Sequence, residues 1–158
     1  MRIFTSRFGE IEIEAERIIT FPAGVPGFEE LRRFVLLPEK DMEEFCWLQS
    51  VDEPEVAFLL TDPFVFFRDY SLELGEDDVC ALELERKEEA LVLTVVTIPG
   101  NDVRLVTANL LAPVVINTRL GLARQVVQVS SPFTTKHRLF CRDSGKKGCV
   151  EAKEEALC

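Results

Sequence analysis

Residues 91–116 read LVLTVVTIPGNDVRLVTANLLAPVVI and hold the clearest secondary-structure signal in the chain. The run at 91–98 is rich in β-branched side chains and lacks the spacing of three to four residues between apolar positions that an amphipathic helix shows. A Pro-Gly pair ends this run, and two further apolar segments follow at 103–110 and 112–116. Apolar runs of this length between turn residues predict short strands.

Similar segments occur along the rest of the chain. At 10–15 acidic residues alternate with apolar ones, as expected of a strand with one buried face. Short helices are predicted only over 28–33 and 39–44. Strands are predicted over 10–15, 34–37, 45–51, 56–60, 81–85, 91–98, 103–110, 112–116 and 122–129. The sequence therefore predicts a mainly β fold, a small antiparallel closed or nearly closed β-barrel, because closure removes the exposed edges that many short strands would leave.

With 158 residues, the chain is long enough for one hydrophobic core. No segment approaches the roughly 18 to 20 consecutive apolar residues of a membrane-spanning helix, and the N-terminus shows no export signal. We therefore expect a cytoplasmic protein that does not bind a membrane. From Cys141 onward the composition becomes polar and rich in glycine and lysine. This change predicts one domain over 1–140 and a flexible polar tail over 141–158.

Charge is distributed unevenly along the chain. Residues 1–102 hold 24 acidic and 9 basic side chains, whereas residues 103–140 hold five basic side chains and no acidic one. The formal net charge of the whole chain is −10. A negative surface repels the phosphate backbone of nucleic acids and attracts basic partners. We therefore expect no direct binding of nucleic acid, and we expect a monomer that binds other proteins.

The residue types that catalysis or cofactor binding requires are scarce or unsuitably spaced. His137 is the single histidine, and the five cysteines are odd in number and lack the C-x2-C spacing of zinc sites. The isolated glycines match no phosphate-binding loop. We therefore predict that the protein is not an enzyme and needs no cofactor or metal. Two alternatives stay open, namely a small-ligand-binding β-barrel and a carboxylate-dependent hydrolase.

Four segments, FPAGVPGFE at 21–29, WLQSVDEPEVAFLLTDPFVFFRDY at 47–70, VVTIP at 95–99 and TANLLAPVVIN at 107–117, occur in the order found in one known family. By these segments the chain resembles the FliW family of flagellar assembly factors. The first matches the family's F-P-x-G-I-P-G-F-E, with valine in place of isoleucine. The matching residues in the first, second and fourth segments include Phe21, Pro22, Gly24, Pro26, Gly27, Phe28, Glu29, Gln49, Ser50, Asp62, Pro63, Phe64, Asn109, Leu110, Ala112, Pro113 and Asn117.

The resemblance implies a role without catalysis. Members of the family bind flagellin before its secretion. Once flagellin has been exported, the released protein binds the translational regulator CsrA and relieves repression of flagellin synthesis. The resemblance thus implies two protein partners, flagellin and CsrA.

Two parts of the chain are predicted to contact these partners. In DPFVFFRDY, Phe64 and Phe66 are expected to face the core, which leaves Phe67 and Tyr70 as exposed aromatic residues for flagellin. The segment 73–89 holds eight acidic side chains, which suit the positive RNA-binding surface of CsrA. The candidates for this second contact are Glu76, Asp77, Asp78, Glu83 and Glu85.

Overall fold

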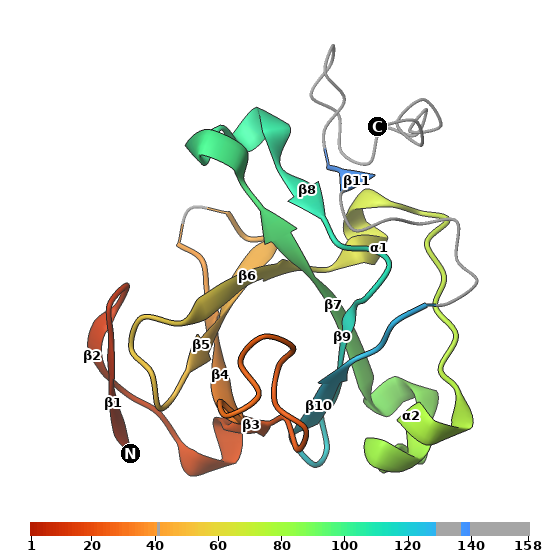
Figure 1. Ribbon diagram of the computed structural model, residues 1–158, viewed down its shortest axis with the longest axis horizontal. Coiled ribbons are helices and arrows are strands. Elements are labelled where there is room, and N and C mark those ends of the chain that lie inside the picture. Colours follow the sequence, from red (N-terminus) through yellow and green to blue (C-terminus); the bar gives the residue numbers. More distant parts are fainter. Residues whose placement is uncertain (41, 129–136, 140–158) are drawn as a thin grey trace.

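The computed structural model describes residues 1–40, 42–128 and 137–139 (Figure 1). Within them no helix is long and apolar enough to cross a bilayer. The tail predicted over 141–158 lies outside the described residues. The helical segments are η1 (Ala15–Arg17), α1 (Pro63–Phe66), α2 (Glu76–Ala81), η2 (Lys87–Glu89), η3 (Pro99–Asn101) and η4 (Val103–Leu105). The strands are β1 (Arg2–Thr5), β2 (Gly9–Glu12), β3 (Ile19–Thr20), β4 (Arg33–Pro38), β5 (Phe45–Ser50), β6 (Ala57–Thr61), β7 (Ala90–Thr97), β8 (Thr107–Ala108), β9 (Val114–Asn117), β10 (Leu122–Gln125) and β11 (His137–Arg138).

The main sheet closes on itself. Its strands pair side by side in the order β7, β6, β5, β4, β3, β10 and β9, and β9 pairs back with β7. Figure 1 looks into the resulting ring, with the loop after β3 near its middle. β8 and β11 extend the sheet outside the ring, beyond the far end of β7. The prediction of a mainly β, closed fold is confirmed.

The ring is weakest between β3 and β10. These two strands meet at a single register pair, Leu122 with Thr20, and they run parallel. The Thr20 N–H donates to the carbonyl of Gly121 at 2.7 Å. The prediction of an entirely antiparallel sheet is therefore wrong at this pair. The physical reason is that seven strands close the ring. An odd number of strands cannot alternate in direction all the way round, so one neighbouring pair has to run parallel.

Apolar side chains fill the inside of the ring. Phe21 and Phe34 pack edge to face, with their ring centroids 5.3 Å apart, and both are almost fully buried. Leu48, Leu60 and Ile116 complete the same cluster from three other strands. Full burial of each such side chain contributes roughly 1.5–3 kcal/mol, so this interior contributes substantially to stability.

The N-terminal hairpin of β1 and β2 covers the outside of the ring. It is a separate two-stranded sheet whose Ile3 and Ile13 pack on Val35 of β4. Its turn is held by the Arg7 guanidinium, which lies 3.8 Å from the centroid of the Trp47 ring. The strand predicted over 10–15 is therefore present but ends at Glu12.

The strand predicted over 81–85 is wrong. The helix α2 occupies the preceding residues, and its first turn carries three acidic side chains, where the helix dipole favours negative charge. After the helix, Glu83 adopts a φ of 52°, which a strand does not allow. The alternation of apolar and acidic residues thus belongs to an irregular segment that buries Leu82.

Other predicted boundaries also differ from the structure. Neither helix predicted over 28–33 and 39–44 forms, because the described residues there make turns that lead into β4 and β5. The segment 103–110 contains η4 and the two-residue β8 instead of one long strand. Its apolar residues are nevertheless buried, with Val106 at 1% and Leu110 at 0% exposure.

The loop 21–29 makes the double turn that its prolines and glycines predict. The Gly24 N–H donates to the carbonyl of Phe21 at 2.8 Å, and the Phe28 N–H donates to that of Val25 at 2.7 Å. Gly24 has a φ of 77°, and a Cβ atom there would collide with the main chain of Glu29. Gly27 has a φ of 90°, but a Cβ atom there would meet no neighbour within 4 Å.

This difference generates a matched pair of substitutions. Gly27→Ala is expected to lower the free energy of unfolding by about 1–2 kcal/mol, the cost of a left-handed conformation for a residue with a Cβ. Gly24→Ala has the same cost plus the collision, so it is expected to lose at least about 2 kcal/mol more. Urea denaturation of both variants measures the difference. Equal losses would show that the loop moves away from Gly24 at little cost.

Candidate partner-binding surface

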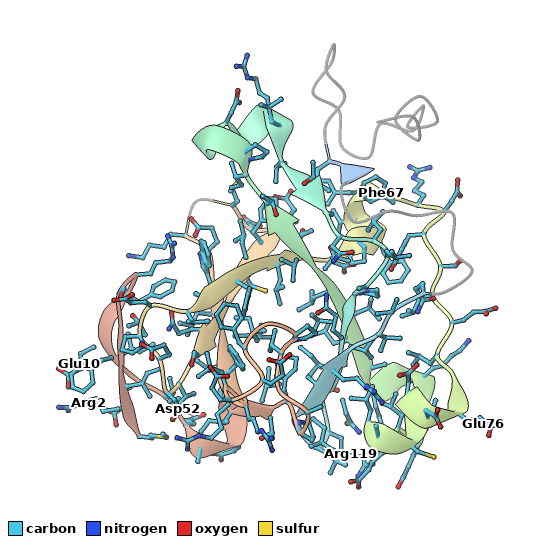
Figure 2. All side chains as sticks on the ribbon, viewed as in Figure 1. Arg2, Glu10, Asp52, Phe67, Glu76 and Arg119 are labelled. Carbon is cyan, nitrogen blue, oxygen red and sulfur yellow. The ribbon has the colours of Figure 1, made fainter. Side chains whose placement is uncertain are left out.

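The acidic residues of segment 73–89 form one face of the molecule. Leu82, just after α2, is buried against Val115 and Val126 on the outer side of β9 and at the end of β10. This packing leaves the carboxylates outside, and Figure 2 shows Glu76 at the rim of the molecule, directed away from the ring. We call this surface the acidic face. Its members are Glu76, Asp77, Asp78, Glu83, Glu85 and Glu88.

Arginines from the other half of the chain neutralise part of the acidic face. Arg124 Nη1 lies 3.4 Å from Asp78 Oδ1, and Arg119 Nη2 lies 3.5 Å from Glu85 Oε2. Within the described part of the chain, Glu76, Asp77 and Glu88 form no ion pair. Sequence reasoning separated an acidic from a basic segment, but the fold places them side by side.

The buried carboxylate of Glu89 anchors the acidic face to the ring. Glu89 is 7% exposed, and its carboxylate accepts the Glu85 N–H at 2.9 Å and the Arg119 Nε–H at 2.8 Å. The backbone N–H of Glu85, together with the Arg119 guanidinium, holds the pKa of Glu89 below its usual value of 4.5, although burial acts in the opposite direction. The hydrogen bond with the Glu89 carboxylate raises the pKa of Arg119.

Asn117 connects the acidic face to β9. Its Nδ2 donates to the carbonyl of Leu82 at 2.8 Å, and its Oδ1 accepts the N–H of Arg119 at 2.9 Å. The side chain is fully buried. The asparagine thereby satisfies backbone groups at the end of the strand. The sequence analysis did not predict the ion pair between Glu89 and Arg119, and no local sequence pattern indicates it.

The aromatic prediction is wrong for three of its four residues. Phe67 and Tyr70 are buried, at 9% and 4% exposure, whereas Phe64 is 46% exposed. The reason is local: Asp62 Oδ1 accepts the Phe64 N–H at 2.9 Å and starts the helix α1, so the alternation of a strand does not apply. Only Phe66 faces the core as predicted.

The burial of Tyr70 has a structural cause. Its O–H donates to the carbonyl of Leu110 at 2.8 Å, and burial raises the pKa of Tyr70 to about 12. In Figure 2, Phe67 lies beside α1, far from Glu76. The exposed apolar residues of this part of the chain are Phe64 and Val65, both 46% exposed.

Further family-motif residues hold turns. Gln49 Nε2 donates to the carbonyls of Pro54 and Val56, at 3.3 and 3.2 Å, and thereby fixes the turn between β5 and β6. Ser50 Oγ accepts the N–H of Glu53 in the same turn at 2.9 Å. The remaining residues lie in three places. Pro22, Pro26, Phe28 and Glu29 are in the exposed part of the loop 21–29, Pro63 is at the start of α1, and Asn109, Leu110, Ala112 and Pro113 form the turn before β9.

The geometry defines a class of protein: a small, closed-sheet β protein with an acidic helical face. Among the described side chains, no three of His, Cys, Asp or Glu gather as a metal site. The sequence profile described as "FliW protein" matches residues 2–139, and the chain belongs to the FliW family.

Named relatives agree with this assignment. The chain is 42% identical over 147 residues to the flagellar assembly factor FliW of Natranaerobius thermophilus, covering 93% of this chain and 97% of that one. It is 43% identical over 140 residues to the protein of the same name from Moorella thermoacetica, covering 89% of each chain. A crystal structure of the flagellar assembly factor FliW superposes with a TM-score of 0.83 at 36% identity, covering 90% of this chain and 99% of that one.

The Glu89 site generates a pH prediction. Because folding lowers the pKa of Glu89, its contribution to stability is full above its unfolded pKa, near 4.5, and is lost as the pH falls through the folded value. Glu89→Gln is therefore expected to be less stable than the wild type at pH 7, with the difference shrinking below pH 4.5. Chemical denaturation at several pH values measures this difference. A gap that stays constant with pH would contradict the assignment, and Glu88→Gln, at an exposed carboxylate without an ion pair, is the control.

Proposed function

We propose that this protein is a flagellar assembly factor that works in the cytoplasm. In this proposal it binds flagellin as a monomer and, when released, binds the translational regulator CsrA and relieves repression of flagellin synthesis. It acts without catalysis and without a cofactor. The observation that carries the proposal is membership of the FliW family over residues 2–139, with relatives named flagellar assembly factors that align over nearly their whole length.

The acidic face supports the CsrA part of the proposal. An RNA-binding protein presents positive charge, so electrostatic complementarity would steer it towards Glu76, Asp77 and their neighbours. Negative charge placed beside an RNA-binding surface opposes phosphates within about one Debye length, roughly 8 Å at physiological salt. RNA would then be excluded even where no RNA contact is covered.

The exposed pair on α1 supports the flagellin part. The terminal segments of flagellin are amphipathic helices that stay unpaired before assembly, and their apolar stripe requires an apolar contact. Phe64 and Val65 present neighbouring apolar side chains and replace the buried Phe67 and Tyr70 as candidates.

The two alternative functions receive less support. A barrel that carries ligands in its interior needs space there. Residues such as Phe21, Phe34 and Leu60 fill most of the interior, and the pocket left beside Gln125 has a volume of about 160 Å³, below the roughly 300–1,000 Å³ of most small-molecule sites. A carboxylate-dependent hydrolase needs two carboxylates with separated pKa values facing one substrate. Glu89, the most deeply buried carboxylate described, is instead bound to Arg119 with a lowered pKa.

The first functional prediction concerns CsrA. Neutralising the carboxylates without ion pairs, in the triple variant Glu76→Gln, Asp77→Asn and Glu88→Gln, is expected to slow association with CsrA by about tenfold at low salt. It should also reduce displacement of RNA from CsrA. Stopped-flow association and RNA-displacement titrations at several salt concentrations measure both effects.

The matched control removes the same number of charges elsewhere. Glu14, Glu53 and Glu55 are exposed and form no described ion pair. Glu14 immediately precedes η1, and the other two lie in the turn between β5 and β6, segments that are away from α2 in Figure 1. Their replacement by glutamine should leave association with CsrA within about twofold. If both triple variants displace RNA as well as the wild type does at low salt, electrostatic exclusion is wrong and steric cover or a change in CsrA explains the effect.

The second functional prediction concerns flagellin. Phe64→Ala with Val65→Ala is expected to weaken flagellin binding by more than about 1 kcal/mol, the usual threshold for an important contact residue, while CsrA binding is retained. Isothermal titration with purified flagellin measures the loss. Phe4→Ala is the control, because Phe4 is 62% exposed on the N-terminal hairpin. Unchanged affinity in the double variant would place the flagellin site on another surface.

A further inference from the structure

The ring has an open strand edge beside its weak junction. Val126 donates its N–H to the carbonyl of Pro113, and β10 pairs with β9 in the register that places Gln125 opposite Val114. Alternate residues of an antiparallel strand turn their backbone groups to opposite sides. The main-chain N–H and C=O of Gln125 therefore point away from β9, towards the side where β3 meets β10 only at Leu122. Among the described residues, no strand pairs with Gln125 on that side.

A pocket lies directly beside this open edge. Its volume is about 160 Å³, and its lining residues come from β10, the loop 21–29 and the inner side of the ring. It is walled mainly by apolar side chains, and no charged residue lines it. Cavities near 150 Å³ with such walls hold one benzene ring. The pocket therefore has room for one aromatic or branched aliphatic side chain. The apolar residues used in this argument are Phe21, Val25, Leu48, Phe58, Val95 and Val114.

Two amide side chains also line the pocket, and both are held in place. Asn109 Oδ1 accepts the N–H of Ala112 at 3.0 Å, and Gln125 Nε2 donates to the carbonyl of Ala112 at 2.8 Å. This leaves Asn109 Nδ2 as a donor and Gln125 Oε1 as an acceptor, neither with a partner among the described residues. A fixed donor and a fixed acceptor beside an apolar pocket complement the polar groups of a peptide bond.

We propose that an extended segment of a partner polypeptide adds to β10 at Gln125 and inserts one aromatic or branched aliphatic side chain into this pocket. The free N–H and C=O of Gln125 select a polypeptide main chain, because both are satisfied when a strand is added to an edge. In the register of that addition, the residue opposite Gln125 points its side chain to the same face, which is the pocket face. The net charge of −10 favours basic residues on either side of the inserted one.

This contact differs from both proposed surfaces, since it uses neither the acidic face nor α1. It is also tested without flagellin or CsrA, so its failure leaves the proposed function untouched. The probe is the synthetic peptide acetyl-Lys-Thr-Phe-Thr-Lys-amide, titrated into the isotope-labelled protein. We expect saturable chemical-shift changes centred on the Gln125 main-chain amide and the Asn109 side-chain amide. The peptide with alanine in place of phenylalanine should bind at least about tenfold more weakly.

A second peptide separates strand addition from simple filling of the pocket. Methylation of the phenylalanine nitrogen removes the N–H that would donate to the Gln125 carbonyl, and it should weaken binding to a similar degree. On the protein, Val25→Phe fills the pocket and should abolish the shifts, whereas Val25→Ala should retain them. Val65→Phe, at a side chain 46% exposed on α1, is the control and should bind like the wild type.

Four results would overturn the proposal. Equal binding of the phenylalanine and alanine peptides, or no binding of either, would show that the pocket does not bind a peptide side chain. Equal binding of the methylated peptide means that a small apolar ligand suffices and no strand is added. Shifts that depend on protein concentration without peptide mean that a second copy of the chain occupies the site. Because the peptide comparisons use the wild-type protein, they decide the question even if Val25→Phe fails to fold.

Discussion

The pairing of β7 with β9 is the constraint on which the rest of the structure depends. β7 pairs with β6 along one edge, and on its other edge it pairs Ala90 to Leu93 with β9 and Val96 to Thr97 with β8. This division turns an open sheet into a ring. The inner face can then be mainly apolar, because every strand of the ring covers it from another side. The interior around Phe21, Phe34 and Leu60 is therefore buried without a covering helix.

Closure also places the charged residues. The turn after β9 brings Arg119 back over the segment that precedes β7, where Glu89 accepts its Nε–H. Asn117, the last residue of β9, fixes the chain around Leu82 and Glu83 through its side-chain amide. The acidic face thus has a defined position because it is fastened to the strand pair that closes the ring. Arg119 and Arg124 form ion pairs with two of its carboxylates, Glu85 and Asp78. The unpaired negative charge of the acidic face is therefore smaller than the sequence alone suggests.

Much of the fold could be predicted from local pattern, and the failures share a physical reason. The strands β4, β5, β6 and β7 follow apolar runs whose neighbours along the chain pair with them, so local sequence is sufficient there. At 81–85 an alternating pattern arises without a strand, because Glu83 takes a left-handed conformation. At Phe64 the capping carboxylate of Asp62 starts a helix and thereby sets the direction of the side chains. The apolar run itself does not show whether its side chains follow the spacing of a helix or that of a strand. The pocket beside Gln125 joins residues from seven parts of the chain, so no single segment indicates it.

The weak junction between β3 and β10 has a consequence for the synthesis of the chain. Thr20 is made early and its partner Leu122 late, so a ribosome exposes one side of the ring long before the other exists. The meander of β4, β5 and β6 joins neighbouring segments and has low contact order, so it can form first. Phe21 and Phe34 are then in water until β9 and β10 emerge. The nascent protein therefore carries an exposed apolar sheet face from the synthesis of β6 until β9 and β10 have been made and cover it.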